Sequence, residues 1–339
     1  MTDRGIVAAQ AQDEEKLFEA SLRPRSLSDF TGQAKLKENL AIAIEAARMR
    51  GEAMDHVLLY GPPGLGKTTL ATLIANELGT AFEQTAAPVL QKKLDLTGLL
   101  SNIRARQVFF IDEIHRLAPD VEEMLYSALE DFRVDILVGT GPGARTHSMP
   151  VPRFTAVGAT TRLGNISAPL RGRFGLVLRL DVYGAAELAG IVGRSARILG
   201  LKIDEAAAEE IARRSRGTPR ISNRLLRRVR DYAQVKANGM LTRQVAVDAL
   251  DLLEVDPLGL DEVDRRIMLC ILEKFDGGPV GLNTLSSAAD EEAGTIEDVN
   301  EPYMIQQGFI DRTPRGRMAT ARAYEYFKIE PRRAQNVLF

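Results

Sequence analysis

The sequence predicts an α/β domain with a parallel sheet covered by helices on both faces, followed by a small all-α domain and a C-terminal winged helix. In the first half of the chain, short apolar runs alternate with segments of helical apolar spacing, which is typical of parallel strands buried on both faces. From about residue 183 the spacing is helical throughout. Residues 257–339 then have the order helix, turn, helix, turn, helix and two extended runs around a basic turn, which is the order of a winged helix.

Each predicted element has a boundary signal. The runs "DHVLLYG", "QVFFIDE" and "FTAVGATT" are short and apolar, as buried strands are, and "KTTLATLIANELG" and "PDVEEMLYSALEDF" have a helical period. Residues 133–154 depart from this rhythm, because they surround a long Gly/Pro turn and so predict an inserted β-hairpin. We expect a flexible tail over 1–20, a large α/β domain over 21–182, a helical domain over 183–256 and the winged helix over 257–339.

The composition is that of an ordinary globular protein from a reducing compartment. The 339 residues carry 44 Lys+Arg and 46 Asp+Glu, a net charge of −2, and are 45% hydrophobic, which suffices for a core of normal size. The sequence contains no run of about 18 apolar residues, so it predicts no membrane-spanning helix. The one cysteine, Cys270, excludes an intrachain disulfide and has the apolar helical spacing of a core residue. His56, His115 and His147 lack metal-ligand spacing. We therefore expect a cytoplasmic location.

The segment "GPPGLGKT", residues 61–68, has the most specific chemistry. It satisfies G-x-x-x-x-G-K-[ST] and stands between a predicted strand and a predicted helix, which is the context that a phosphate-binding loop requires. Glycines let backbone N–H groups close around phosphates, and the helix N-terminus adds positive potential. Lys67 would reach the β- and γ-phosphates, and Thr68 would hold Mg²⁺. The loop residues that we expect at the nucleotide are Gly61, Gly64, Gly66, Lys67, Thr68 and Thr69.

An acidic pair follows a later strand. In "VFFIDEIH", residues 108–115, Asp112 and Glu113 end a hydrophobic run, where two carboxylates are costly unless they face a cation. Asp112 can hold Mg²⁺, and Glu113 can orient and polarise the attacking water. His115 could take part in a relay or contact a neighbour, and an ordinary surface histidine fits the sequence equally well.

Three further motifs are placed to respond to a nucleoside triphosphate. "GATTR" puts Thr160 and Thr161 at the end of the third predicted strand, near the expected γ-phosphate. "APLRGRFG" presents Arg171 and Arg173 on a loop, from which an arginine can reach the nucleotide of a neighbouring subunit. "RGTPR" opens a helix with Arg220 just inside it, aimed at the nucleotide. The guanine-recognition sequence NKxD is absent, which favours ATP.

In this order and spacing, the motifs resemble those of the AAA+ ATPases, and the full set is most similar to the RuvB family of Holliday-junction branch-migration motors. The strings "DHVLLYGPPGLGKTTLA", "FIDEIHRL", "RSRGTPRI", "GGPVGL", "EPYMIQQGF" and "RTPRGR" carry the resemblance, which runs from about Ser21 to the C-terminus. It implies a P-loop ATPase domain, a helical lid and a DNA-binding winged-helix head, assembled into a hexameric ring. It also implies ATP and Mg²⁺ as cofactors, the junction-binding protein RuvA as a partner, and RuvC in the resolving complex.

The resemblance also implies further residues around the nucleotide. Arg171 or Arg173 would be the finger that acts across the subunit interface, a choice that the sequence leaves open, and Arg220 would be the second sensor. On the adenine side of the nucleotide the resemblance implies Leu22, Arg23 and Tyr183. It also implies Glu130, Asp131 and Phe132 beside the nucleotide.

The resemblance gives two surface features a partner. "RTPRGR" would be the wing, and its Arg312, Arg315 and Arg317 would grip DNA phosphates, so that binding is sequence-tolerant and salt-dependent. Without the resemblance, a solvated turn would be the alternative. Ile136 and Leu137 on the hairpin would bind RuvA, since a protruding apolar hairpin favours a protein partner. A hairpin folded onto its own domain is the alternative there.

Two other functions stay open, and three stretches depart from the expected family pattern. A nucleotide-switched DNA loader or initiator would have the same motifs without sustained translocation. A protein-unfolding AAA+ machine would carry an aromatic residue after the second strand, and "TAAPVLQKKLDLTGLLSN" has none. "TAAPVL" and "SSAADEEAGT" are unusual, and Asn300 stands where we expect an aliphatic residue, which predicts looser packing of the head.

Overall fold

The computed structural model describes residues 19, 21–138 and 145–331, and the chain divides into two compact units. The first unit contains Met1–Gly200 and Gly217–Arg224, and the second contains Leu201–Arg216 and Leu225–Phe339. Over the described ranges, no helix is long and apolar enough to cross a membrane.

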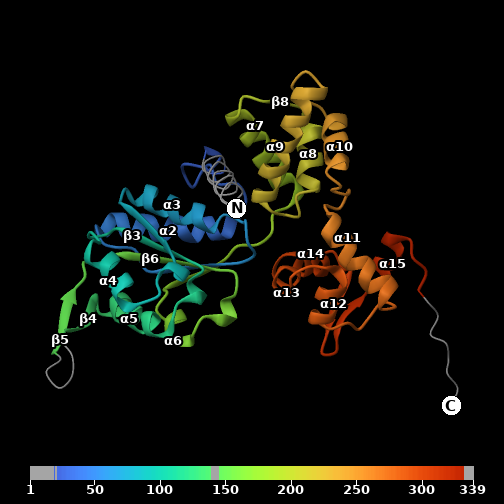
Figure 1. Cartoon of the computed structure of the whole chain (residues 1–339). Helices are drawn as coiled ribbons and strands as arrows, with labels where there is room; N and C mark the ends of the chain where they lie inside the picture. Colours follow the sequence, from blue (N-terminus) through green and yellow to red (C-terminus); the bar gives the residue numbers. More distant parts are fainter. Residues whose placement is uncertain (1–18, 20, 139–144, 332–339) are drawn as a thin grey trace, which may run out of the picture. The chain divides into compact units, whose positions relative to one another are not determined.

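A five-stranded parallel sheet organises the first unit (Figure 1), with the strands in the order β2-β3-β6-β1-β7. The three central strands are almost fully buried, and they are the three that the sequence predicts. The edge strands lack a long apolar run, because β2 has the partly exposed sequence FEQTA and β7 is only LVLR. The bounds are β1 Val57–Tyr60, β2 Phe82–Ala86, β3 Val108–Asp112, β6 Thr155–Thr160 and β7 Leu176–Arg179.

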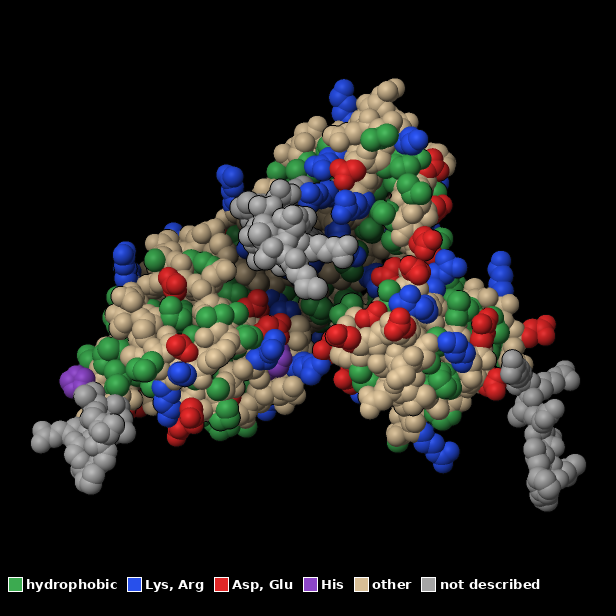
Figure 2. Space-filling view, viewed as in Figure 1, with side chains coloured by type: hydrophobic (Ala, Val, Ile, Leu, Met, Phe, Trp, Pro, Cys, Tyr) green, Lys and Arg blue, Asp and Glu red, His purple; other side chains and the backbone are tan. Residues whose placement is uncertain are grey.

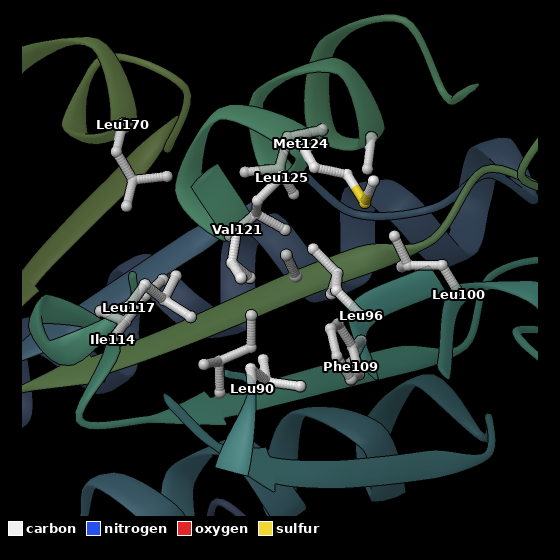
Figure 3. Close-up of a cluster of buried hydrophobic side chains, with 14 of the residues drawn as sticks. Leu90, Leu96, Leu100, Phe109, Ile114, Leu117, Val121, Met124, Leu125 and Leu170 are labelled. Atoms are coloured by element: carbon white, nitrogen blue, oxygen red, sulfur yellow. The ribbon is translucent and has the colours of Figure 1, made fainter. Parts of the chain in front are cut away.

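Helices cover both faces of this sheet, as predicted. Figure 1 shows α2 and α3 on one side and α4, α5 and α6 on the other. The second face is sealed by leucines of α4 and α5 that pack towards Phe109 of β3 (Figure 3). Burial of such side chains supplies most of the folding free energy, at about 25 cal/mol per Å² of apolar surface. The bounds are α2 Ala34–Arg50, α3 Lys67–Leu78, α4 Lys93–Ser101, α5 Pro119–Glu130, α6 Ala168–Arg171 and α7 Ala185–Ile198.

The inserted hairpin is present and is separate from the parallel sheet. β4 (Arg133–Val138) pairs antiparallel with β5 (Arg145–Pro150), and the predicted turn between them lies outside the described residues. Val134 is fully buried, and Ile136 and Met149 are partly buried against the core of the large domain. The base of the hairpin is therefore anchored by its own domain. Leu137 belongs to β4, and its side chain lies outside what the structure describes.

In the second unit, three helices form a small domain that also holds a short strand pair. α8 (Glu205–Arg213) packs on α10 (Arg243–Leu252), and β8 (Lys202–Ile203) pairs parallel with β9 (Met240–Leu241). The sequence gives no signal for a two-residue strand, so this domain was predicted as helical throughout. α9 (Pro219–Lys236) begins in the first unit and continues into this one.

The remainder of the second unit is a winged helix with its own core. The antiparallel strands β10 and β11 form the wing, and Val280 adds a further antiparallel bridge to Arg317. Cys270 is buried among the apolar residues of this core, as expected. The bounds are α11 Glu262–Leu269, α12 Leu282–Ala289, α13 Ala293–Thr295, α14 Glu301–Gln306, α15 Ala321–Phe327, β10 Ile310–Thr313 and β11 Gly316–Ala319, with π-helical turns at Cys270–Lys274 and Ile296–Asn300.

Candidate functional site

The glycines after β1 fold as an anion-binding loop requires. Gly61, Gly64 and Gly66 have φ values of 146°, 77° and 102°, a region that favours glycine. A Cβ on Gly61 would lie 2.4 Å from the Leu180 carbonyl oxygen, and a Cβ on Gly64 would lie 2.7 Å from the Thr218 side chain. The loop ends at Gly66, and α3 begins directly after it, so the free N–H groups of the helix face the loop.

Lys67, the first residue of α3, is held inside this loop. Its side chain is buried, and Nζ donates hydrogen bonds to the carbonyl oxygens of Gly61 at 2.8 Å and Pro62 at 2.9 Å. Burial lowers the pKa of Lys67, whereas the carboxylates of Asp112 and Glu113 raise it. An anion entering the loop would supply the compensating charge that a buried ammonium needs.

The acidic pair lies at the end of the neighbouring strand β3. The backbone N–H of Glu113 donates to Oδ1 of Asp112 at 3.0 Å, and Glu113 has a left-handed φ of 51° that ends the strand sharply. The pair and the loop line one pocket of the first unit, together with Thr161 at the end of β6. The predicted site residues that line it are Leu22, Arg23, Gly64, Gly66, Lys67, Thr68, Thr69, Asp112, Glu113, Thr161, Tyr183 and Arg220.

Residues around the start of α7 and in the segment before α2 also line the pocket. Tyr183 donates its hydroxyl hydrogen to the carbonyl oxygen of Leu65 at 3.2 Å, and burial raises the pKa of its phenol. Arg194 donates to the carbonyl oxygens of Leu22 at 3.1 Å and Asp29 at 2.7 Å, which ties the N-terminal segment to α7. Arg194 also lines the pocket and was not predicted, because nothing in "GRSARI" indicates a partner more than 160 residues earlier.

Arg220 reaches the pocket from the start of α9. Its Nε lies 3.0 Å from Oε1 of Glu19, and its side chain is 62% exposed. The packing of Thr218 and Arg220 against Gly64 brings this helix start onto the phosphate loop. A positive charge at this place can respond to the presence of phosphates.

Comparison with known proteins now decides the family. Three family profiles cover nearly the whole described chain: the Holliday junction DNA helicase RuvB P-loop domain at residues 22–180, the RuvB AAA lid domain at 183–256 and the RuvB C-terminal winged helix domain at 257–328. The chain belongs to the RuvB family of AAA+ ATPases. Its fold is accordingly a P-loop AAA+ domain with a lid and a winged helix.

Individual relatives agree with this assignment. The chain is 71% identical over 330 residues to the Holliday junction branch migration complex subunit RuvB of Solibacter usitatus, covering 97% of this chain and 96% of the relative. It is 61% identical over 334 residues to the same subunit of Koribacter versatilis, covering 98% and 93%. The solved structure of the Thermotoga maritima RuvB Holliday junction branch migration motor matches with a TM-score of 0.83 and 49% identity, covering 91% of this chain and 99% of that one.

Seven of the residues that we expect at the nucleotide do not line the pocket. Gly61 is the loop residue whose carbonyl oxygen accepts from Lys67, and Thr160 is fully buried at the end of β6 beside His115. The other five lie elsewhere in the large domain, so the expectation that Glu130, Asp131 and Phe132 lie beside the nucleotide is not met within one chain. They occupy the end of α5 and the α6 region and are Glu130, Asp131, Phe132, Arg171 and Arg173.

Packing explains where these residues lie. Phe132, with a left-handed φ of 53°, stacks edge-on against Phe154 and under Arg153. Arg173 is held by three groups: Nη2 lies 2.7 Å from Glu130 Oε2, Nη1 donates to the Pro169 carbonyl oxygen at 2.7 Å, and the guanidinium lies 4.5 Å from the centre of the Tyr126 ring. The Arg171 side chain, by contrast, is exposed.

The three arginines of the wing have different environments. Arg315 is exposed at the turn, and Arg312 is 56% exposed with Nη2 2.8 Å from Glu297. Arg317 does not match the expectation of a surface contact, because its side chain is 8% exposed and bonded to Glu301. On the face of the head that Figure 2 shows, acidic and basic side chains are interspersed. The wing tip is therefore the part of "RTPRGR" that is open to a polyanion.

Proposed function

We propose that this chain is the ATP-hydrolysing motor of a branch-migration complex, working on four-way DNA junctions as a hexameric ring with RuvA and, in the resolving complex, with RuvC. The observation that carries the proposal is the match of all three RuvB domains in one chain, together with a pocket in the first unit that is lined by the phosphate-loop lysine and the acidic pair. The names of the two bacterial relatives, branch migration complex subunits, support an assembly with DNA and partner proteins.

The pocket residues fit ATP with Mg²⁺. The glycines have positive φ values and pack closely on Leu180, Thr218 and Phe30, so only glycine lets the loop close with its N–H groups free for phosphates, and the buried Lys67 ammonium offers a counter-charge. Thr68 and Asp112 would hold the ion with oxygen ligands, which Mg²⁺ prefers. The bound nucleotide supplies the phosphoryl group whose transfer to water releases free energy for movement.

The chain's own residues divide the remaining work. Glu113 orients the attacking water and accepts its proton, and Thr161 lies at the same pocket to contact the terminal phosphate. Leu22, Arg23 and Tyr183 line the same pocket and would contact the adenine. Arg220 senses the nucleotide from the start of α9. Each of these roles depends on placement within one pocket.

A neighbouring subunit would complete the site. Arg173 is the better candidate for the finger, because Tyr126 and Glu130 already orient its guanidinium, whereas the side chain of Arg171 is exposed. Glu130 pairs with Arg173, and Asp131 and Phe132 follow it directly in the chain, so these residues would approach the neighbour's nucleotide together with Arg173. This arrangement explains why five implied residues lie away from the pocket of their own chain.

A junction-dissociation assay tests the proposal. A synthetic four-way junction is mixed with the protein, ATP and Mg²⁺, with and without RuvA, and strand separation is followed by fluorescence. ATP-dependent dissociation, stronger with RuvA and absent with Lys67→Ala, is the expected result. ATP hydrolysis without dissociation, even with RuvA present, would contradict the proposal and favour a nucleotide-switched loader.

A further inference from the structure

His115 lies between the acidic pair and the strand that carries the predicted phosphate sensor. It is the middle residue of a short 3-10 turn, Ile114–Arg116, directly after Glu113. Its side chain is 9% exposed, so it is not the ordinary surface histidine that the sequence also allowed. Its Nδ1 lies 3.0 Å from the hydroxyl oxygen of Thr160 and 3.4 Å from Oε2 of Glu113.

The position of this turn is fixed by close packing on β6. Ile114 is buried, and a Cβ on Gly158 would lie 2.9 Å from its terminal methyl group. Gly158 therefore lets the turn lie directly on the strand. Residues two apart on a strand face the same side, so Thr160 faces the turn as Gly158 does. The contact between His115 and Thr160 is thus set by the fold of two core elements.

The neighbouring Glu113 carboxylate favours a proton on Nδ1 of His115. The Thr160 hydroxyl oxygen is fully buried and accepts the backbone N–H of Arg162 at 2.9 Å, and its second lone pair can accept from the imidazole. An unprotonated Nδ1 would direct a lone pair at the Glu113 carboxylate 3.4 Å away, which is electrostatically unfavourable. With the proton on Nδ1, the imidazole donates its N–H to the Thr160 hydroxyl at 3.0 Å and keeps a favourable electrostatic contact with the Glu113 carboxylate at 3.4 Å.

We propose that His115 is a positioning residue for ATP hydrolysis, which ties the Glu113 carboxylate to the end of β6 and so fixes it relative to Thr161. One carboxylate oxygen is engaged by the imidazole, which leaves the other to polarise water. Glu113 is 35% exposed, so without this contact its side chain would have several orientations available. The inference rests on the proposed role of Glu113 as the group that activates water.

Two substitutions of His115 separate the hydrogen bond from the shape of the side chain. Asn places its amide nitrogen at the same distance along the side chain as Nδ1, so His115→Asn keeps a donor there, whereas His115→Phe keeps a ring without one. In the Phe variant Thr160 still accepts from Arg162, so no buried hydroxyl loses its last partner. We expect His115→Phe to lower kcat for ATP hydrolysis about 10- to 100-fold, since small displacements of a catalytic group cost rates of this order, with nucleotide affinity unchanged. His115→Asn should recover most of the rate.

The experiment measures kcat and KM for ATP hydrolysis, and the affinity for a fluorescent ATP analogue, in the full-length protein with DNA. His115→Phe is also combined with Glu113→Gln, where it should cost nothing more if both act through one step. Equal rates for wild type and His115→Phe, an Asn variant as slow as the Phe variant, or loss of nucleotide affinity in both would each overturn the proposal. A wild type that hydrolyses ATP without dissociating junctions would contradict only the function proposed above, because these readouts are hydrolysis and binding.

Discussion

Arg317 and Glu301 form a buried ion pair beneath the wing, with Nη2 2.8 Å from Oε2. The Arg317 side chain is 8% exposed and the Glu301 side chain 2%. Arg317 also stands directly opposite Arg312 across the β10–β11 pair, and two like charges so placed repel each other. Glu301 offsets this repulsion, since it also lies 3.8 Å from Nε of Arg312. The wing is therefore attached to α14 by charge as well as by the β-ladder.

Removal of Arg317 should mainly lower the stability of the winged-helix head, and any effect on DNA binding should follow from that loss. Arg317→Ala leaves the Glu301 carboxylate buried without its partner, and breaking such a pair costs about 3–5 kcal/mol. Thermal unfolding followed by circular dichroism should show this loss. The double change Arg317→Met with Glu301→Leu removes both charges and should recover most of the stability. An Arg317→Ala protein as stable as wild type with weakened DNA binding would instead restore the sequence-based view of Arg317 as a surface contact.

Arg315 should contribute to DNA binding without contributing to stability. Its side chain is exposed at the wing turn, so Arg315→Ala should lower affinity for any duplex about two- to fivefold at low salt and reduce the salt dependence by about one phosphate contact. Fluorescence anisotropy over a salt series measures both. Glu297→Gln is the matched opposite, because it frees Arg312 from a carboxylate 2.8 Å away and should strengthen binding. Unchanged affinities in both variants would mean that the wing does not touch DNA.

Local patterns predicted most of the catalytic domain, and long-range pairings account for what they missed. The central strands, the phosphate loop and the acidic pair each have a signal within about ten residues, and the structure brings them to one pocket. The burial of Arg317 depends on a glutamate of another helix, and the clamp by Arg194 depends on a segment at the other end of the domain. Arginines in a basic turn look alike in sequence, and only the fold separates the exposed Arg315 from the buried Arg317.

Asn300 should stabilise the head in a pH-dependent way. The sequence suggested that it loosens packing, but the side chain is buried, and Nδ2 donates to Oδ1 of Asp264 at 2.7 Å. Burial raises the pKa of Asp264 to about 6, while Arg216 and the Asn300 hydrogen bond act in the lowering direction. Because this pKa is above the ordinary value of 3.8, folding takes up a proton in that window, and the contribution of Asp264 to stability falls as the pH rises towards 6.

Replacement of Asn300 by leucine should therefore cost more at high pH than at low pH. Above pH 6 Asp264 is ionised in the folded protein, and Asn300→Leu removes a donor to that charge, at about 1–3 kcal/mol. At pH 5 the carboxyl is mostly protonated, and the loss should be smaller. Urea unfolding of both proteins at pH 5 and pH 8 gives the comparison. Equal losses at the two pH values would show that the amide acts through packing and not through the charge of Asp264.

Tyr126 should support Arg173, the arginine that we propose as the finger, through its ring. The ring lies 4.5 Å from the Arg173 guanidinium, and the hydroxyl is fixed by Glu122 and by Ser167 at 2.9 Å. Tyr126→Leu removes the cation–π contact and should lower ATP turnover of the assembled protein about tenfold, with ATP affinity unchanged. Tyr126→Phe keeps the ring and should stay close to wild type. If the Phe variant were as slow as the Leu variant, the hydroxyl network and not the ring would orient Arg173.

Neighbouring residues of strand β4 should serve different roles, one in folding and the others in binding RuvA. Val134 is fully buried and Ile136 is partly buried at the base of β4, and Leu137 follows Ile136 towards the turn. Val134→Ala should lower the free energy of unfolding by about 1 kcal/mol or more, because it leaves a cavity in the core. The double variant Ile136→Ser, Leu137→Ser should hydrolyse ATP without RuvA at a rate near that of wild type. RuvA should no longer stimulate its junction dissociation, which the fluorescence assay measures. If the hairpin served only its own domain, both variants would lose stability. A double variant that unfolds at a lower temperature but keeps its stimulation by RuvA would therefore assign Ile136 to the core.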